Sequence, residues 1–196
     1  TTVSKMADIP RDQAKTINLG LFYGMGKAKL QAELGVSKDK AEELFSVYHQ
    51  RVPFVKTLMK SVSNRAQQRG QIRTLLGRLC RFHLWEPNRF GINKALPFEQ
   101  AVQEHGQGNI RRAYTYKALN KLIQGSAADM TKKSMLDLYK EGIIAHIQIH
   151  DELDLSVESP EQAKKVVEIM ENAVKLDVPN KVDYESGKNW GDIYDK

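Results

Sequence analysis

Residues 11–26 read RDQAKTINLGLFYGMG, a stretch with the spacing of a helix. In a helix, every fourth residue from position 11 falls in one stripe about 18 Å long, at roughly 1.5 Å rise per residue. The stripe consists of Arg11, Lys15, Leu19 and Tyr23. Two cations followed by an apolar side chain and a ring suit a ligand with a polyphosphate at one end and a flat base at the other. The alternative, a solvated helix with incidental charges, is equally compatible with this spacing.

The other faces and the ends of this helix can also be predicted. Ile17 and Leu21 lie away from the stripe and are expected to anchor the helix to a core. Pro10 suits the first helical turn, and Asp8 can cap it. Three residues without a Cβ allow close approach of a ligand or a neighbouring backbone and allow the helix to end. These residues are Gly20, Gly24 and Gly26.

The pattern R-x-x-x-K-x-x-x-L-x-x-x-Y-G resembles motif B of the family A DNA polymerases, the group of bacterial DNA polymerase I and many phage enzymes. The resemblance implies that the helix over residues 9–26 closes on the incoming nucleotide. Arg11 and Lys15 would grip the triphosphate, and Lys15 could protonate the leaving group. Leu19 would lie beside the sugar and Tyr23 against the template base or sugar. Most members carry Phe or Tyr in place of Leu19, and the form of the motif suggests a phage member.

The composition is that of a globular protein that can bury one core or two subdomains. The 196 residues are 41% hydrophobic and 28% charged, with a net charge of +6, which favours a polyanionic partner. The lone Cys80 excludes an intrachain disulfide, fits a reducing compartment such as the cytoplasm, and is expected to be a buried small hydrophobe. No signal peptide or membrane span is recognisable, since His146 and Gln148 interrupt the most apolar run. A first residue of Thr1 suggests a fragment or a processed product.

Residues 27–34, 38–50 and 53–69 are predicted to be helices that pack on one another and carry no chemistry. In the next segment, T-x-x-G-R-x-x-R resembles a family stretch that forms a loop in the fingers. Arginines among aromatic residues suit contact with nucleic acid, although an ordinary exposed basic loop is the simpler interpretation. The arginines are Arg73, Arg78, Arg81 and Arg89. Residues 86–108 have no clear period and are predicted to be a loop with one short helix.

Residues 109–139 are predicted to form one long helix or a broken pair. Within them, ALNKLIQGSAAD resembles the family helix that runs beneath the primer–template. Asn120 and Gln124 are the matching polar positions, which would reach acceptors in the minor groove; without the resemblance they are ordinary helix residues. Where bacterial relatives have an arginine two turns before the glutamine, this chain has Tyr116, with Lys117 beside it. Whether Lys117 replaces that DNA contact stays open.

Residues 143–159, IIAHIQIHDELDLSVES, alternate apolar and polar residues around an acidic pair, which predicts a β-hairpin with the pair at its turn. The hairpin resembles motif C of the family, Q-x-H-D-E. The resemblance implies that Asp151 is a ligand of Mg²⁺, of which the complete enzyme holds two ions. Glu152 would assist, with direct coordination left open, whereas His150 and Gln148 would contact DNA, His150 at the primer terminus. A turn aspartate by itself is weak evidence.

The C-terminal segment is predicted to contain an amphipathic helix over residues 160–176. The following V-D-Y-E-S-G-K-N-W resembles the last strand of the family and its C-terminal G-x-N-W. Trp190 is expected to be a packing anchor.

The expected fold is α/β (α+β), with helical fingers over residues 1–108 and a palm portion over residues 109–196 that contains the antiparallel hairpin. The implied function is template-directed transfer of deoxynucleotides to a primer 3′ end in DNA replication, with primer–template DNA and dNTPs as partners. Family members need a second catalytic aspartate in motif A, which is absent here, as are the thumb and any exonuclease domain. The isolated chain is therefore expected to be inactive.

Two explanations of this absence stay open. The chain is either a truncated record of one long polymerase or one subunit of a split polymerase whose partner carries the rest. A third interpretation, from another class, is a noncatalytic nucleic-acid-binding derivative of a polymerase. The retention of both motifs speaks against it, because binding alone does not need that set of side chains.

Overall fold

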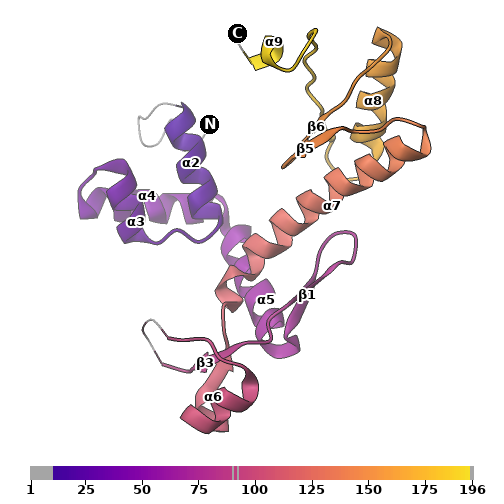
Figure 1. The fold of residues 1–196 in the computed structure, drawn as a ribbon. Helices are drawn as coiled ribbons and strands as arrows, with labels where there is room; N and C mark the ends of the chain where they lie inside the picture. Colours follow the sequence, from indigo (N-terminus) through magenta and orange to yellow (C-terminus); the bar gives the residue numbers. More distant parts are fainter. Residues whose placement is uncertain (1–10, 90, 92, 195–196) are drawn as a thin grey trace. The chain divides into compact units, whose positions relative to one another are not determined.

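The computed structural model describes residues 11–89, 91 and 93–194 (Figure 1). The predicted cap and first-turn residues, Asp8 and Pro10, lie outside the described residues. The chain divides into two compact units, residues 1–123 and 124–196. We predicted a boundary between fingers and palm at residues 108 and 109. That boundary is a functional one, and a division into compact units does not test it.

The first unit begins with helices that confirm the sequence prediction. They are α2 (Arg11–Phe22), α3 (Lys27–Leu34), α4 (Lys38–Arg51) and α5 (Pro53–Arg69). The side chain of Ser37 accepts a hydrogen bond from the N–H of Lys40 and so caps α4. Gly35 ends α3 in the left-handed region, at φ +63°. The buried core of these helices consists of Ala14, Ile17, Leu21, Leu30, Leu44 and Tyr48.

The helix of the opening stretch ends earlier than Gly26. After Phe22, the N–H of Tyr23 still donates to Leu19 at 3.0 Å, and Gly24 then turns the chain at φ +90°. A Cβ on Gly20 would overlap the methyl group of Met25. The side of Gly20 that lacks a Cβ is therefore occupied by the Met25 side chain in this structure.

The segment predicted as a basic loop is a β-hairpin. Strand β1 (Gln71–Arg73) pairs antiparallel with β2 (Leu79–Arg81), with Ile72 opposite Cys80. The side chain of Arg73 donates to the carbonyl of Gly77 at 2.9 Å and closes the turn. Cys80 is half-buried and packs against the core, in line with its expected apolar role.

Residues 109–117 contain no α-helix, only 3-10 turns and a strand, so the prediction of a long helix from Asn109 is wrong for this part. Strand β4 (Ile110–Arg112) pairs with β3 (Trp85–Pro87), which the sequence analysis also missed. This pairing satisfies backbone groups that a helix would otherwise use. The remaining short elements are α6 (Phe98–His105), which is the one short helix expected in residues 86–108, η1 (Gln107–Asn109) and η2 (Thr115–Lys117).

Helix α7 (Ala118–Lys140) starts directly after η2. Its first residues pack on α5 and the β1–β2 hairpin in a second core of the first unit. This core consists of Val62, Ala66, Ile72, Phe82, Ala118 and Leu119.

The second unit contains the rest of α7, the hairpin of β5 (Ile147–Ile149) and β6 (Glu152–Asp154), α8 (Pro160–Asn172) and α9 (Gly191–Tyr194). Its core is formed by Leu138, Ile143 and Val166. The strand expected within residues 182–190 does not form, since these residues have no strand partner among those that the structure describes. Trp190 is 45% exposed, so it is not the buried anchor that we expected.

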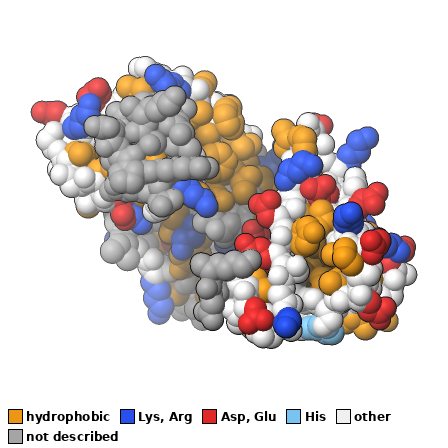
Figure 2. Space-filling view, turned by 90° about the horizontal axis from the view of Figure 1, so that it is seen from above, with side chains coloured by type: hydrophobic (Ala, Val, Ile, Leu, Met, Phe, Trp, Pro, Cys, Tyr) orange, Lys and Arg blue, Asp and Glu red, His pale blue; other side chains and the backbone are white. Residues whose placement is uncertain are grey.

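The surface includes many exposed apolar side chains, and Figure 2 shows such side chains gathered between charged ones on the face in view. On β5, Ile147 and Ile149 are 41% and 36% exposed, so this strand is not covered within its own unit. A two-stranded hairpin is marginally stable alone and depends on its neighbours. No helix in the described part of the chain is long and apolar enough to span a membrane.

Gly70 is expected to be the glycine least tolerant of a side chain. It lies at φ +67°, and a Cβ there would stand 2.6 Å from Cζ of Arg112. Two contacts hold that guanidinium in place: its Cζ lies 4.5 Å from the ring centroid of Trp85, and its Nη1 donates to the carbonyl of Phe82 at 2.9 Å. Gly70→Ala should lower the free energy of unfolding by about 2–5 kcal/mol, from left-handed backbone strain and overpacking together.

Gly35→Ala is the matched control in thermal or urea denaturation. Gly35 has nearly the same φ, +63°, but a Cβ there meets no atom within 4 Å. Gly35→Ala should lower the free energy of unfolding by only about 1–2 kcal/mol, the cost of the left-handed backbone alone. Equal losses of unfolding free energy in Gly70→Ala and Gly35→Ala would show that the Arg112 side chain moves aside for the new methyl group.

Candidate functional site

Lys15 and Leu19 of the predicted stripe lie on the solvent side of α2. Ala14, Ile17 and Leu21 are 0%, 1% and 2% exposed and hold the opposite face against the core. Lys15 is exposed and Leu19 is 45% exposed. Helix α2 therefore presents these two residues to a ligand while its buried face fixes its position. Arg11 is the first residue of the helix, and its side chain lies outside the described residues.

Tyr23 stands at the end of the stripe, just past the last residue of α2. Its ring packs edge-on against Phe22, with centroids 5.4 Å apart and planes at 85°. Phe22 in turn packs against the second core of this unit. The ring of Tyr23 is half-buried and held by that contact, which leaves part of it accessible.

The motif C residues lie together at the tip of the β5–β6 hairpin. His150 and Asp151 form its two-residue turn, with Ile149 opposite Glu152 in the register. His150 adopts φ +53°, a conformation that non-glycine residues rarely take. The amide of Gln148 donates to the carbonyl of His150 at 2.6 Å and stabilises the turn. The side chains of Asp151 and Glu152 are exposed.

The two carboxylates at this tip suit a hard cation but do not form a complete metal site. Mg²⁺ prefers one or two carboxylates and fills its other positions with water and phosphate oxygens. Asp151 and Glu152 supply such oxygens on a fixed turn. Within the part of the chain that the structure describes, no three His, Cys, Asp or Glu side chains are grouped to hold a metal.

Asn120 and Gln124 lie one turn apart in α7. Asn120 is half-buried, and its Oδ1 is buried with no hydrogen-bond partner in the structure. Gln124 is exposed.

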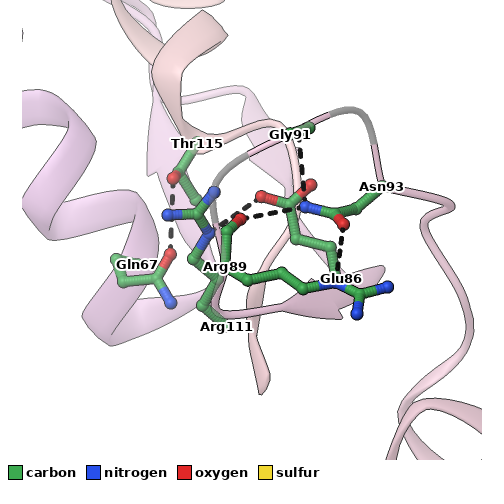
Figure 3. A network of polar contacts seen from close by, with 7 residues as sticks. All are labelled: Gln67, Glu86, Arg89, Gly91, Asn93, Arg111 and Thr115. Carbon is green, nitrogen blue, oxygen red and sulfur yellow. Dashed lines mark hydrogen bonds and ion pairs between the residues drawn. The ribbon is translucent and has the colours of Figure 1, made fainter. Parts of the chain in front are cut away.

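Arg73 and Arg89, two of the arginines proposed for nucleic-acid contact, make hydrogen bonds within their own turns. Arg73 donates to the carbonyl of Gly77, and Nε of Arg89 donates to Oδ1 of Asn93 at 3.4 Å (Figure 3). Arg78 and Arg81 are exposed. Arg73 and Arg89 therefore stabilise local turns, a role that the sequence did not reveal.

Lys117, which the resemblance suggested as a DNA contact, lies beside two aromatic rings before α7. Nζ of Lys117 lies 5.2 Å from the ring centroid of Tyr114 and 5.6 Å from that of Tyr116. The sequence analysis placed Lys117 beside Tyr116 but did not predict the contact with Tyr114.

Comparison with known proteins gives one consistent result. The sequence model of DNA polymerase family A matches residues 1–192. A DNA-directed DNA polymerase of Pseudomonas phage M6 is 32% identical over 223 residues, covering 96% of this chain and 30% of that protein. DNA polymerase I of Bacillus caldotenax is 37% identical over 191 residues, covering 93% of this chain and 20% of that protein.

A solved structure is similar in fold as well as in sequence. It is the POL domain of Pol1 from M. smegmatis in complex with DNA primer–template and dNTP. The TM-score is 0.67 at 28% identity, covering 90% of this chain and 31% of that one. The chain thus spans 20–31% of the length of these three proteins.

Proposed function

The chain belongs to DNA polymerase family A, and from this we propose that it supplies the fingers, residues 1–108, and the closing part of the palm, residues 109–196, of a template-directed DNA polymerase. The observation that carries the proposal is the solvent-facing stripe on α2, opposite a face that is almost fully buried. A helix built in this way can present Lys15 to a triphosphate without rearranging its own core.

The nucleotide would lie along α2. Arg11 and Lys15 pair with the phosphates, and Lys15 donates a proton to the leaving pyrophosphate. Leu19 packs beside the sugar, and the accessible part of Tyr23 contacts the template base or sugar. Because α2 is fixed by its buried face, these groups bind the nucleotide in one orientation.

Asp151, assisted by Glu152, would hold Mg²⁺ at the hairpin tip. When bound, the metal ions activate the primer 3′-hydroxyl and stabilise charge on the pyrophosphate. His150 would hold the primer terminus beside this carboxylate, on the turn that Gln148 braces.

The DNA duplex would lie against α7. Asn120 and Gln124 can donate to minor-groove acceptors, which every base pair offers, so the contact follows pair shape and not sequence. Gln148 and Lys117 would add contacts to the DNA. The M. smegmatis domain, which binds primer–template and dNTP, supports this assignment by similarity.

The completed enzyme, in this proposal, consists of these 196 residues together with a portion that carries motif A and the thumb, in cis or in trans. A second carboxylate, from motif A, would complete the metal site to which Asp151 contributes one ligand. The phage relative supports a phage-type enzyme that acts in a bacterial cytoplasm. The 196 residues alone would not polymerise.

Primer extension by the completed enzyme tests the proposal. With Mg²⁺ and four dNTPs, we expect elongation of an annealed primer along its template. DNA binding without elongation, by an enzyme that folds and includes motif A, would favour a noncatalytic nucleic-acid-binding derivative instead.

Leu19 is expected to set discrimination against dideoxynucleotides. A tyrosine hydroxyl in its place can make the polar contact that the absent 3′-hydroxyl leaves unmet, whereas leucine has no polar atom. An unmet hydrogen bond in a desolvated site costs on the order of 1–3 kcal/mol. In the completed enzyme, Leu19→Tyr should therefore raise the efficiency ratio of dideoxy- to deoxynucleotide incorporation by roughly 10–100-fold.

Leu136→Tyr is the matched control, since Leu136 is 49% exposed on α7 and Leu19 is 45% exposed. The control should leave the ratio unchanged. If Leu19→Tyr lowers the use of all nucleotides equally, Leu19 only packs the helix.

A further inference from the structure

The positive charge of the chain is concentrated in one run of its sequence. Between Glu43 and Glu86 the chain has no acidic residue, whereas it has eight lysines and arginines there. The net charge of all 196 residues is only +6, so the whole excess of positive charge lies in this run. Helix α5 forms its middle part. This region of the first unit therefore attracts an anionic partner.

Helix α5 carries a stripe of exposed residues on its outer side. Val55, Val62 and Ala66 are 1%, 8% and 0% exposed and hold the inner face in the core. On the other side, residues three or four positions apart fall in one row from Phe54 onward. The row, which we call the α5 stripe, consists of Phe54, Leu58, Ser61, Arg65 and Arg69.

The α5 stripe has an apolar end and a cationic end. Phe54, in the first turn, is 59% exposed although it is a large apolar side chain. Arg65 and Arg69 are exposed in the last two turns. Because the helix is fixed by its buried face, both ends are presented at a constant separation. A ligand that matches this separation loses little entropy of the protein on binding.

The two arginines lack acidic partners. They are four residues apart on one helix, where like charges repel and lower the stability of the helix. Within the described part of the chain, neither arginine is paired with an acidic side chain, whereas Glu42 and Glu43 of α4 are paired with lysines. The guanidinium fork binds a carboxylate through two parallel hydrogen bonds. Carboxylates of a partner would therefore supply what the pair lacks.

The stripe faces away from the segment before α7. Gln67 lies between the two arginines in sequence, and its side-chain amide is hydrogen-bonded to the hydroxyl of Thr115 on η2 at 3.3 Å (Figure 3). Residues two positions apart point to opposite sides of a helix. Arg65 and Arg69 thus point away from η2, which carries Lys117, the residue assigned to DNA in the proposed function.

From these observations we propose that the α5 stripe docks an acidic segment of a partner protein, with an apolar side chain of that segment on Phe54 and carboxylates on Arg65 and Arg69. A nucleic-acid strand suits the stripe less, because base stacking needs rings interleaved with cations, and here one ring stands apart from them. The proposal goes beyond the polymerase reaction and does not depend on it.

The geometry of the helix sets the spacing in the partner. Arg65 and Arg69 follow Phe54 by about 16 Å and 22 Å along the axis, at roughly 1.5 Å per residue. An extended chain advances about 3.3 Å per residue. The carboxylates of an extended partner should therefore lie about five to seven residues from its apolar side chain.

Fluorescence anisotropy with the 196-residue chain and a labelled peptide tests the docking. The peptide has one leucine and, about six residues farther, two glutamates, with glycine and serine between them. The double variant Arg65→Gln, Arg69→Gln should weaken binding by about tenfold, through loss of both carboxylate pairs. Phe54→Ser should also weaken binding by about tenfold, whereas Phe54→Leu should bind nearly as well as the unchanged chain.

The matched control is the double variant Lys56→Gln, Lys60→Gln. It removes two exposed cations with the same four-residue spacing from the same helix, but outside the α5 stripe. It should change the affinity by less than about twofold, as expected of charges that do not touch the ligand. A second peptide, with its glutamates next to the leucine, should bind about tenfold more weakly, because only one end of the stripe can be engaged.

A labelled oligothymidylate separates the protein partner from nucleic acid. Both double variants should lose the same affinity for it, since each lowers the charge of α5 equally. A larger loss of oligothymidylate affinity in the arginine variant, with peptide affinity unchanged, would overturn the proposal and assign the stripe to nucleic acid. The proposal would also be overturned by absence of saturable peptide binding, by equal losses of peptide affinity in the two double variants, or by equal affinities of the two peptides.

Discussion

Asp151→Asn is expected to reduce the turnover of the completed polymerase by roughly 10³-fold or more, because the metal loses the charge that balances it. Asparagine has nearly the same size as aspartate and is favoured in turns, so the two-residue turn at His150 should keep its conformation. The side chain is exposed, and the structure shows no packing role that the substitution would damage. Single-turnover primer extension at saturating Mg²⁺ gives the rate directly.

Binding measurements must accompany the rate. Primer–template affinity should change little in Asp151→Asn, since the metal acts on the reacting atoms. Lys15→Ala should instead raise the dNTP concentration needed for half-maximal rate, with DNA affinity nearly intact. Glu168→Gln removes an exposed carboxylate from α8 and should change neither quantity. Equal losses of DNA affinity in Asp151→Asn and Lys15→Ala would show that these residues build the fold and not the chemistry.

The helices of the first unit could be predicted because their signals are local. Ser37 caps α4, and Gly35 and Gly70 end α3 and α5 in the left-handed conformation, as expected of these residue types. The boundaries of α3 and α5 were correct for this reason. The small sheets had no such signal. Each strand has three residues, and Trp85 pairs with Arg112, 27 positions later, so only tertiary contact selects them.

In the candidate site, too, features with a local sequence signal could be predicted and features that depend on tertiary contacts could not. The exposure of Lys15 and Leu19 followed from helical periodicity, and Asp151 at a hairpin turn followed from alternation along the two strands. The position of Lys117 beside the rings of Tyr114 and Tyr116 did not, because it depends on the left-handed conformation of Tyr114 and on the hydrogen bond between Thr115 and Gln67. The C-terminal strand was predicted wrongly because a strand needs a partner that this segment lacks in the described structure.

The central claim is that these residues supply the nucleotide-binding helix and one catalytic carboxylate, whereas a second carboxylate must come from motif A. Incorporation of a single dNTP opposite a defined template base, with and without that portion, tests it most directly. With Mg²⁺, the completed enzyme should add the complementary nucleotide and reject the other three, and the 196-residue chain alone should add none, because two metal ions cannot be held by the Asp151 tip by itself. Mg²⁺-dependent, template-directed addition by the isolated chain would contradict the claim.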